Sequence, residues 1–360
     1  MMLSIIKMID VPQKASRVAA PWKGGAMGNA TVHDVARIAQ VGLATVDRVL
    51  NNRGNVSAKT VAKVQAAVAQ TGYVRNLAAA NLARQRVYRL CFVIPAGETG
   101  FIASLLHAIE AQRAALIEDQ VLVHIVQTRA FDVAGQVAAL RGLDCDAVAI
   151  MVSEAPDIQD EVARLRSAGV HVLTFVADLP RSDREAYVGI DNVAAGRLAG
   201  DFMGRFLHGA GPVLMVAGSL AARDHNERMM GFRQVMQERF ASLPLLPAME
   251  GADDAATVER LVLEAAQAQA LGGIYAIGAG NRGLVAALRN MAQRPVTIVH
   301  ELTPTSRNAL RDGLFDLVLD QDCTAATATA IKIMRDLIEG REIPAEAGKI
   351  RLNIHSRENI

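Results

Sequence analysis

Cysteine, aromatic residues and long apolar runs are scarce in this sequence of 360 residues. The three cysteines, Cys91, Cys145 and Cys323, are odd in number, far apart and within or beside apolar runs. This pattern indicates small core residues and excludes a disulfide framework or a cysteine-based zinc cluster. The apolar start, Met1 to Val11, is interrupted by two charged residues and is too short to span a membrane. We therefore expect a cytoplasmic protein without a membrane partner.

The composition favours one fold class. Only 4% of the residues are aromatic, whereas 51% are hydrophobic and 21% are charged. Many alanines and valines with few aromatics suit helices packed on buried parallel strands better than an all-β sandwich. The length allows two or three domains with a large core. An α/β enzyme would share these properties, so composition alone does not identify the function.

Basic residues are concentrated near the N-terminus. Residues 1–29 lack sustained apolar periodicity, and we interpret them as a flexible arm. Between Ala30 and Arg89 the chain carries nine Lys and Arg but only two Asp, although its formal net charge is +1. Such segregation indicates a polyanionic partner at this end, because phosphate contacts dominate nucleic-acid affinity. A solvated basic face is the alternative.

Three short helices are predicted in this basic segment. The Thr31-x-x-Asp34 spacing is that of a capping box, which marks a helix start. A break at residues 40–42 separates this helix from a second one, and Ser57 can cap a third that stops at Gly72. Two short helices joined by a tight break are typical of a helix-turn-helix, whose second helix enters the major groove of DNA. An ordinary helical hairpin is the alternative.

The order and spacing of residues here resemble the DNA-binding head of the lactose-repressor (LacI/GalR) family. The resemblance is carried by Thr31-Val32-x-Asp34-Val35-Ala36, Val41-x-x-Ala44-Thr45-Val46-x-Arg48-Val49-Leu50-Asn51, Val56-Ser57-x-x-Thr60 and Gly72-Tyr73-x-x-Asn76. It implies a helix-turn-helix domain over residues 30–75 that binds a double-stranded DNA operator. It also implies phosphate contacts from Thr31, Asn51, Ser57, Thr60 and Tyr73, and base readout by Leu43, Ala44 and Arg48. An arginine suits this role because it can pair with guanine through two hydrogen bonds.

Further DNA contacts are expected from Thr45, Asn76, Ala79 and Leu82. Residues 76–88 form an alanine-rich stretch too short to be a stable helix alone. The resemblance implies a hinge helix that orders on DNA, with Leu82 wedged into the minor groove. A plain linker is the alternative.

Three positions depart from the family pattern. Gly42 and Asp47 each replace a usual serine, and Arg75 replaces a usual proline. Asp47 brings a negative charge close to DNA, where it either repels phosphate or accepts from a cytosine amino group.

A two-lobed α/β core is predicted over residues 89–345, followed by a C-terminal segment over 346–360. Short apolar runs alternate with helical patterns there, which indicates parallel sheets wrapped by helices. The predicted strands are 90–94, 121–126, 147–152, 170–175, 187–190, 213–216, 273–277, 297–299 and 317–319. The fold class is therefore α/β, with a helix-turn-helix head in front of a core that resembles periplasmic binding proteins.

Polar residues that follow these strands are the candidate ligand site, because ligands of such folds bind at the carboxyl ends of strands. The candidates are Phe101, Asp191, Asp224, His225, Arg228, Asn281, Arg282, Glu301 and Gln321. Carboxylates, amides and guanidinium groups in one cleft suit a hydroxyl-rich or zwitterionic ligand. The resemblance to LacI/GalR proteins and periplasmic sugar-binding proteins rests here on Val188-Gly189-Ile190-Asp191-Asn192 with Gly196-Arg197, on Arg228-x-x-Gly231-Phe232 and on Gln321-Asp322. It implies a sugar or polyol effector and a homodimer that reads an inverted repeat, with a tetramer as the alternative.

Other functions remain open. Gly278-x-Gly280-x-x-Gly283, with Glu301 about twenty residues later, satisfies a dinucleotide fingerprint. The core alone would also suit a solute-binding protein for transport. Asp224-His225-x-Glu227 is a weak metal-site pattern, because no second pair of ligands lies at supporting spacing. We expect no metal and no cofactor, and because no nucleophile and base pattern is present we expect a protein that is not an enzyme.

Overall fold

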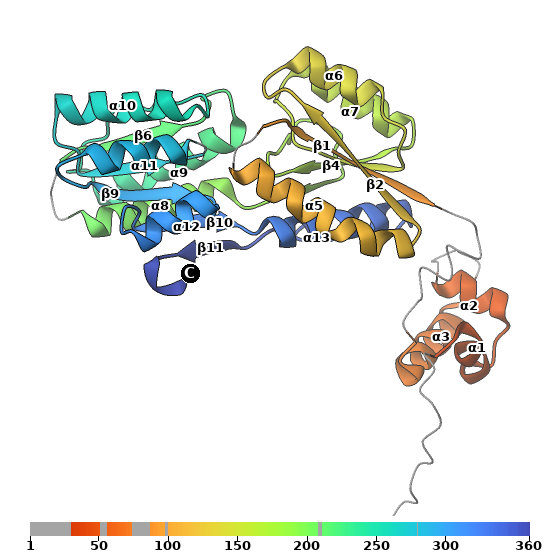
Figure 1. The fold of residues 1–360 in the computed structure, drawn as a ribbon. Helices are drawn as coiled ribbons and strands as arrows, with labels where there is room; N and C mark the ends of the chain where they lie inside the picture. Colours follow the sequence, from red (N-terminus) through yellow and green to blue (C-terminus); the bar gives the residue numbers. More distant parts are fainter. Residues whose placement is uncertain (1–29, 51–55, 74–86, 98–99, 208–210, 279) are drawn as a thin grey trace, which may run out of the picture. The chain divides into compact units, whose positions relative to one another are not determined.

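The computed structural model describes residues 30–50, 56–73, 87–97, 100–207, 211–278 and 280–360 (Figure 1). The chain divides into two compact units, one ending at Asn76 and the other beginning at Leu77. We call the described part of the first unit the head and that of the second the core. In the described residues no helix is long and apolar enough to cross a membrane.

The head contains three helices, as predicted: α1 (Val32–Ala39), α2 (Leu43–Leu50) and α3 (Ala58–Thr71). The capping box forms, because the Thr31 hydroxyl accepts from the Asp34 amide and the Asp34 carboxylate accepts from the Thr31 amide at 3.0 Å. Gln40 ends α1 in the left-handed conformation, with a φ of 53°. The Ser57 side chain caps α3 by accepting from the Thr60 amide at 3.3 Å.

Small apolar side chains close the core of the head. Val46 is the buried residue of α2, and it packs against α1 and α3. The buried set is Val35, Ala36, Ala39, Val46, Val64 and Ala67. Because one face of α2 is fixed inward in this way, its opposite face is left at the surface.

Lobe 1 of the core is built on a parallel five-stranded sheet in the order β2-β1-β3-β4-β5. The strands are β1 (Tyr88–Pro95), β2 (Val121–Thr128), β3 (Ala147–Ile150), β4 (His171–Phe175) and β5 (Ala186–Val188). Helices α6 (Val133–Arg141) and α7 (Pro156–Ser167) cover one face. The other face is covered by α5 (Gly100–Glu118) together with α13 (Cys323–Ile338), which comes from the far end of the chain (Figure 1).

Lobe 2 is built on a six-stranded sheet in the order β11-β10-β9-β8-β6-β7. The strands are β6 (Val213–Ala217), β7 (Met249–Glu250), β8 (Gly273–Ala276), β9 (Val296–His300), β10 (Leu317–Gln321) and β11 (Leu352–His355). Helices α8 (Asn192–Phe206) and α9 (Arg223–Arg239) cover one face. Helices α10 (Ala255–Ala268), α11 (Asn281–Asn290) and α12 (Pro304–Arg311) cover the other.

One strand of lobe 2 was not predicted and is not parallel to its neighbour. β11 runs antiparallel to β10, with Val318 opposite His355 and Gln321 opposite Leu352. It lies at the edge of the sheet and only part of it is buried. Its short alternating sequence is weaker than the continuous apolar runs of the central parallel strands, which were all predicted.

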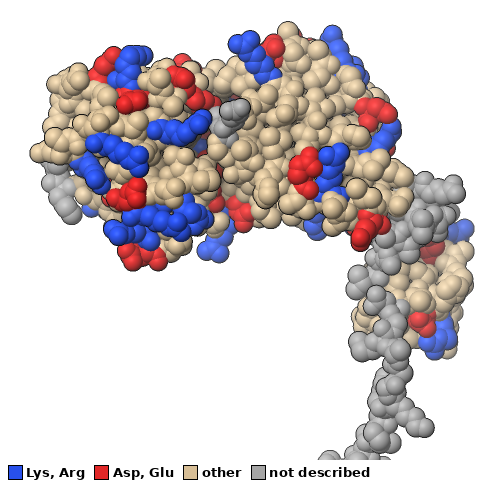
Figure 2. Space-filling view, in the orientation of Figure 1, with Lys and Arg blue, Asp and Glu red and all other residues tan. Residues whose placement is uncertain are grey.

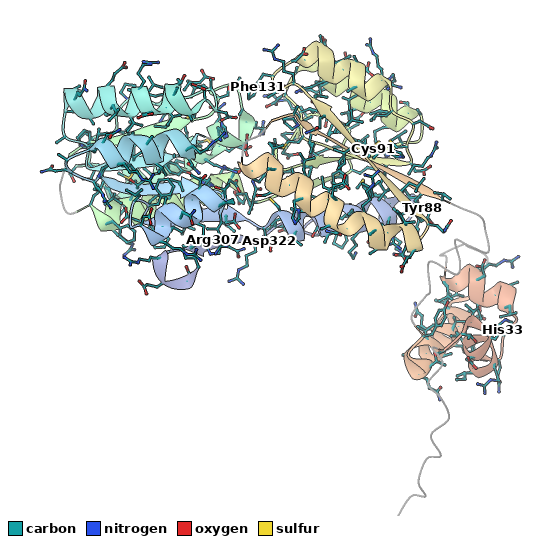
Figure 3. All side chains as sticks on the ribbon, viewed as in Figure 1. His33, Tyr88, Cys91, Phe131, Arg307 and Asp322 are labelled. Carbon is teal, nitrogen blue, oxygen red and sulfur yellow. The ribbon has the colours of Figure 1, made fainter. Side chains whose placement is uncertain are left out.

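The chain passes between the lobes after β5, after β10 and after α13. Asp322 lies at the second crossing, where its carboxylate caps α13 by accepting from the amides of Thr324 and Ala325 (Figure 3). Gly189 in the first crossing pairs with Lys349 in the third through an isolated β-bridge, and paired crossings of this kind allow two lobes to hinge. On the face that Figure 2 draws, acidic and basic side chains are interspersed over both lobes.

Candidate functional site

A cavity of about 740 Å³ lies in the core and is lined by residues of both lobes. Lobe 1 contributes the start of α5 and the segments after β2, β3 and β4. Lobe 2 contributes the starts of α9 and α11 and the segments after β9 and β10. These segments meet because the carboxyl ends of parallel strands share one edge of each sheet. The volume suits a small-molecule ligand.

The structure brings together most of the predicted ligand residues. Eight line the cavity, and they are Phe101, Asp224, His225, Arg228, Asn281, Arg282, Glu301 and Gln321. All except Phe101 belong to lobe 2.

Asp191 does not line this cavity, contrary to the expectation. Its carboxylate caps α8 by accepting from the Ala194 amide at 2.9 Å. It borders instead a separate, smaller cavity together with Glu346 and Lys349. The residue that turns inward after β5 is its neighbour, Asn192, which is buried.

Arg228 is the buried cation of the site, with only 2% of its surface exposed. Its Nε donates to Asn192 Oδ1 at 2.9 Å, and its Nη1 donates to the carbonyl of Ile277 at 2.9 Å. Its Nη2 is 3.8 Å from Glu301 Oε1. A buried charge is stable only when it is paired and hydrogen-bonded in this way.

Two glycines allow the backbone of α9 to approach α8 and so position Arg228. A Cβ built on Gly196 would lie 1.9 Å from the carbonyl oxygen of Arg228. A Cβ built on Gly231 would lie 2.1 Å from the carbonyl oxygen of Val193. The motif residues Gly196 and Gly231 therefore serve helix packing, which in turn sets Arg228 beside Asn192.

Glu301 follows β9 in an unusual conformation. Its φ is 72°, in the left-handed region that a side chain with a Cβ rarely adopts. Gln321 Nε2 donates to its Oε1 at 3.0 Å, and no described residue donates to its buried Oε2. Burial raises the pKa of the Glu301 carboxyl to about 8, although the Arg228 charge opposes the shift.

Asn281 begins α11 directly after Gly280, whose φ is 94°. Its Nδ2 donates to the carbonyl of His300 at 3.0 Å, while its buried Oδ1 accepts from no described residue. His300 is completely buried, and its Nε2 shares a hydrogen bond of 2.8 Å with the Tyr275 hydroxyl. Burial lowers the pKa of the His300 imidazole.

The glycines of the dinucleotide fingerprint each have a packing role. A Cβ on Gly283 would lie 1.9 Å from the carbonyl oxygen of Ala255, so this glycine brings α11 against α10. A Cβ on Gly278 would lie 2.3 Å from His225 Nε2. A Cβ on Gly280 would lie 2.6 Å from a methyl group of Val258. The spacing that satisfied the fingerprint is thus explained by contacts inside the protein.

His225 lies among acidic side chains at the ends of β6 and β8. The Ser219 amide lies 3.2 Å from its Nδ1, and Asp224 Oδ2 lies 3.9 Å from its Nε2. Burial raises the pKa of the neighbouring Asp253. Glu227, the third member of the suggested metal pattern, pairs with Arg223 Nε at 2.8 Å. In the described residues no group of three His, Cys, Asp or Glu side chains is arranged to hold a metal ion.

Lobe 1 contributes lining residues that the sequence reasoning missed. Phe131 follows β2 with a φ of 60° and is 49% exposed, on the side of lobe 1 that faces lobe 2 (Figure 3). Gln136, Glu154 and Asp178 also line the cavity. Glu154 and Asp178 follow β3 and β4, so the rule applied to lobe 2 would have found them.

The head presents a candidate nucleic-acid interface on α2. Leu43, Ala44 and Arg48 are exposed on α2, and Leu43 is 43% exposed. Ala44 and Arg48 lie on the face opposite the buried Val46. Thr45 lies next to them and is half-buried. This is the face that the second helix of a helix-turn-helix turns to the major groove.

Three of the four hydroxyl-bearing residues predicted to bind phosphate, Thr31, Ser57 and Thr60, lie at helix starts. Thr31 and Ser57 are exposed N-cap residues, and the Ser57 and Thr60 hydroxyls are 2.9 Å apart. Tyr73 follows α3 and is half-buried. Asn51, Arg75, Asn76, Ala79 and Leu82 lie outside the described residues.

Two family models match the chain. Residues 31–76 match the model described as bacterial regulatory proteins, lacI family. Residues 90–342 match the model described as periplasmic binding protein domain. The second match covers most of the chain.

Curated relatives with similar sequences are named as regulators. The chain is 27% identical over 216 residues to the HTH-type transcriptional regulator DegA of Bacillus subtilis, covering 60% of this chain and 62% of DegA. It is 50% identical over 52 residues to the maltose regulon regulatory protein MalI of Vibrio furnissii, covering 14% of this chain and 38% of MalI. The chain thus matches less than two thirds of the length of either relative.

Solved structures with a similar fold include sugar-binding proteins. A solute-binding protein of an ABC transporter from Burkholderia graminis, in complex with D-arabinose, has a TM-score of 0.69 at 21% identity and covers 76% of this chain and 96% of its own. GanP, a glucose-galactose binding protein from Geobacillus stearothermophilus, has a TM-score of 0.68 at 17% identity and covers 76% and 99%. At such identities the likeness concerns the fold alone.

Proposed function

Because this chain belongs to the family of the periplasmic binding protein domain and carries a head of the bacterial lacI family, we propose that it is a transcriptional regulator. Its head binds an operator in double-stranded DNA, and its core binds a small polar effector, a sugar or polyol. It acts in the cytoplasm as a repressor, and as a homodimer whose two heads read an inverted repeat. We propose no enzymatic activity for it.

The observation that carries this proposal is the exposed face of α2. Leu43, Ala44 and Arg48 are exposed on α2 while Val46 is buried, although exposure of the apolar Leu43 side chain to water is unfavourable. On DNA, Leu43 and Ala44 can contact a thymine methyl and Arg48 can pair with guanine. A protein that only binds a ligand through its core would not require the head.

The polar lining of the cavity supports a hydroxyl-bearing effector. Amide, carboxylate and guanidinium groups of lobe 2 face the cavity together with Phe101 and Phe131 of lobe 1. A sugar offers hydroxyl groups to the first set and apolar ring faces to the second. Residues of both lobes would contact the same ligand, so binding favours the closed arrangement of the lobes. The effector then changes DNA affinity by the difference in its own affinity for the two arrangements.

The test is a mobility shift with purified protein on DNA fragments that flank its gene. We expect salt-sensitive binding to one fragment in the presence of excess competitor DNA, and release by at least one sugar or polyol. Failure to bind any duplex, with or without small molecules, would refute the proposal.

Transport is the second candidate, favoured by the fold likeness to solute-binding proteins. It predicts sugar binding by the core without any effect on DNA. The same mobility shift separates the two, because only a regulator couples sugar binding to DNA release.

A further inference from the structure

We propose that the effector carries a basic nitrogen, a protonated primary or secondary amine on a polyol or sugar skeleton, and that this ammonium group binds Glu301, Gln321 and Asn281. The inference rests on the proposed function, because it names the chemical class of the molecule that binds in the same cavity.

Three buried oxygens of residues that line the cavity lack a hydrogen-bond partner among the described residues. They are Glu301 Oε2, Gln321 Oε1 and Asn281 Oδ1, and all three residues line the cavity. Glu301 follows β9, Gln321 ends β10 and Asn281 follows β8, and these strands are adjacent in the sheet, so the three residues lie at one stretch of its carboxyl edge. A buried acceptor without a donor is costly, so such a cluster points to a missing ligand that donates.

The orientation of the two amides is set by the protein. Gln321 Nε2 is committed to Glu301 Oε1 at 3.0 Å, and Asn281 Nδ2 is committed to the carbonyl of His300 at 3.0 Å. Each amide therefore turns its oxygen, not its nitrogen, away from these partners. These two hydrogen bonds also hold Asn281 and Gln321 next to Glu301, because one is made to Glu301 and the other to the preceding residue, His300.

Charge favours a cation over a neutral donor at this place. Two donor nitrogens of Arg228 already bind Asn192 and Ile277, and its third lies toward Glu301. Asp224 and Asp253 line the same cavity and add negative charge. A hydroxyl donates one hydrogen and itself needs a donor, whereas a primary ammonium offers three hydrogens and accepts none. Two unpaired amide oxygens and a carboxyl that becomes an acceptor when it ionises, with other carboxylates nearby, match the ammonium.

The protonation of Glu301 links this ion pair to pH. Burial raises the pKa of its carboxyl to about 8, and the groups that act on it are Arg228 and Asp224 of α9 and Asp320 and Gln321 of β10. Below pH 8 most of the carboxyl is neutral, and it must lose its proton before it pairs with an ammonium. Amine affinity should therefore rise by more than about tenfold between pH 6 and pH 7.5, with release of a proton on binding.

The experiment is titration calorimetry of the full chain with three matched pairs: D-glucosamine and D-glucose, N-methyl-D-glucamine and D-sorbitol, and 2-amino-1,3-propanediol and glycerol. We expect at least one amine to bind tenfold or more tightly than its hydroxyl partner at pH 7.5. Titrations in two buffers of different ionisation enthalpy should report the released proton for N-methyl-D-glucamine and 2-amino-1,3-propanediol, whose amines are already protonated at pH 7.5. This second readout uses only the unmodified protein.

Variants assign the effect to the cluster. Glu301→Gln keeps the shape and the acceptor for Gln321, and it should reduce the amine preference to within about threefold and abolish the proton release. Glu264→Gln, on the exposed face of α10, makes the same chemical change away from the cavity and should alter neither. An amine preference that survives in Glu301→Gln would overturn the assignment.

Two further outcomes would overturn the inference. One is that the hydroxyl member of every binding pair binds as tightly as its amine, without proton release. The other is that no amine of the panel binds at 50 mM. Neither outcome touches the proposed function, whose failure is recognised separately by the absence of DNA binding in the mobility shift.

Discussion

At the scale of single residues, Glu301 combines three unfavourable properties. Its backbone is left-handed, its carboxyl is buried and one of its oxygens lacks a donor among the described residues. Such features cost of order 1–3 kcal/mol each and persist where a site requires them. The rest of the core must therefore stabilise this residue in the absence of ligand.

We expect the replacement Glu301→Gln to stabilise the free protein more as the pH rises. The folded-state pKa of the carboxyl is about 8, above the ordinary value of 4.5. Between these values the folded protein binds more protons than the unfolded chain, so the native carboxyl lowers stability as pH increases. Thermal unfolding of both proteins should show a difference in midpoint that is small at pH 5 and grows toward pH 8.

The exposed replacement Glu264→Gln is the control for this experiment, because Glu264 pairs with Arg260 at the surface. Its unfolding midpoint should follow that of the unmodified protein across the range. A difference between Glu301→Gln and the unmodified protein that does not vary with pH would contradict the assigned burial of the charge.

At the scale of secondary-structure elements, the contact between α8 and α9 positions the buried arginine. We expect Gly231→Ala to destabilise the core by about 3 kcal/mol, because its Cβ would meet the backbone of α8 at 2.1 Å. Urea unfolding measures the loss. The matched control is Gly142→Ala, where the new Cβ would make ordinary contacts at 3.6 Å and φ is −83°. An equal free energy of unfolding for the two variants would show that α8 and α9 can move apart without loss of stability.

At the start of α2 we expect a substitution that stabilises the protein. A Cβ added to Gly42, which precedes the helix, would have no atom within 4 Å, and the Gly42 carbonyl accepts from the amides of Thr45 and Val46. Gly42→Ser should therefore add a helix cap and stabilise the head by a few tenths of a kcal/mol. It should also tighten operator binding if the hydroxyl reaches a phosphate. Thermal unfolding and a mobility shift measure the two effects, and a weaker head would contradict the open space at this position.

The elements and the site were predictable to different extents. Continuous apolar runs predicted the central parallel strands, because burial on both faces requires them. β7, with two residues, and the antiparallel edge strand β11 lack such a run. Phe131 was missed because its place at the cavity depends on a left-handed turn after β2. Asp191 was misplaced because one residue in the turn decides whether 191 or 192 faces inward.

At the scale of the whole molecule, the basic residues near the N-terminus and the exposed residues of α2 lead to a prediction about operator affinity. Arg48→Ala should weaken operator binding by roughly 1–3 kcal/mol and relax specificity at one base pair. Competition binding with operators altered at single positions measures both effects. Effector binding by the core should be unchanged, since Arg48 belongs to the other unit. Unaltered affinity and specificity would remove Arg48 from base readout.

The position of α13 in lobe 1 has a consequence for synthesis on the ribosome. Its residues Ala326, Ala330, Ile331 and Met334 complete a core whose first strand, β1, is made much earlier. At 5–20 residues per second, roughly 10–50 s separate the two during translation. The apolar surface that α13 will cover is exposed to chaperones throughout that interval. The head, whose described apolar cluster lies within residues 32–73, can fold before the core has been synthesised.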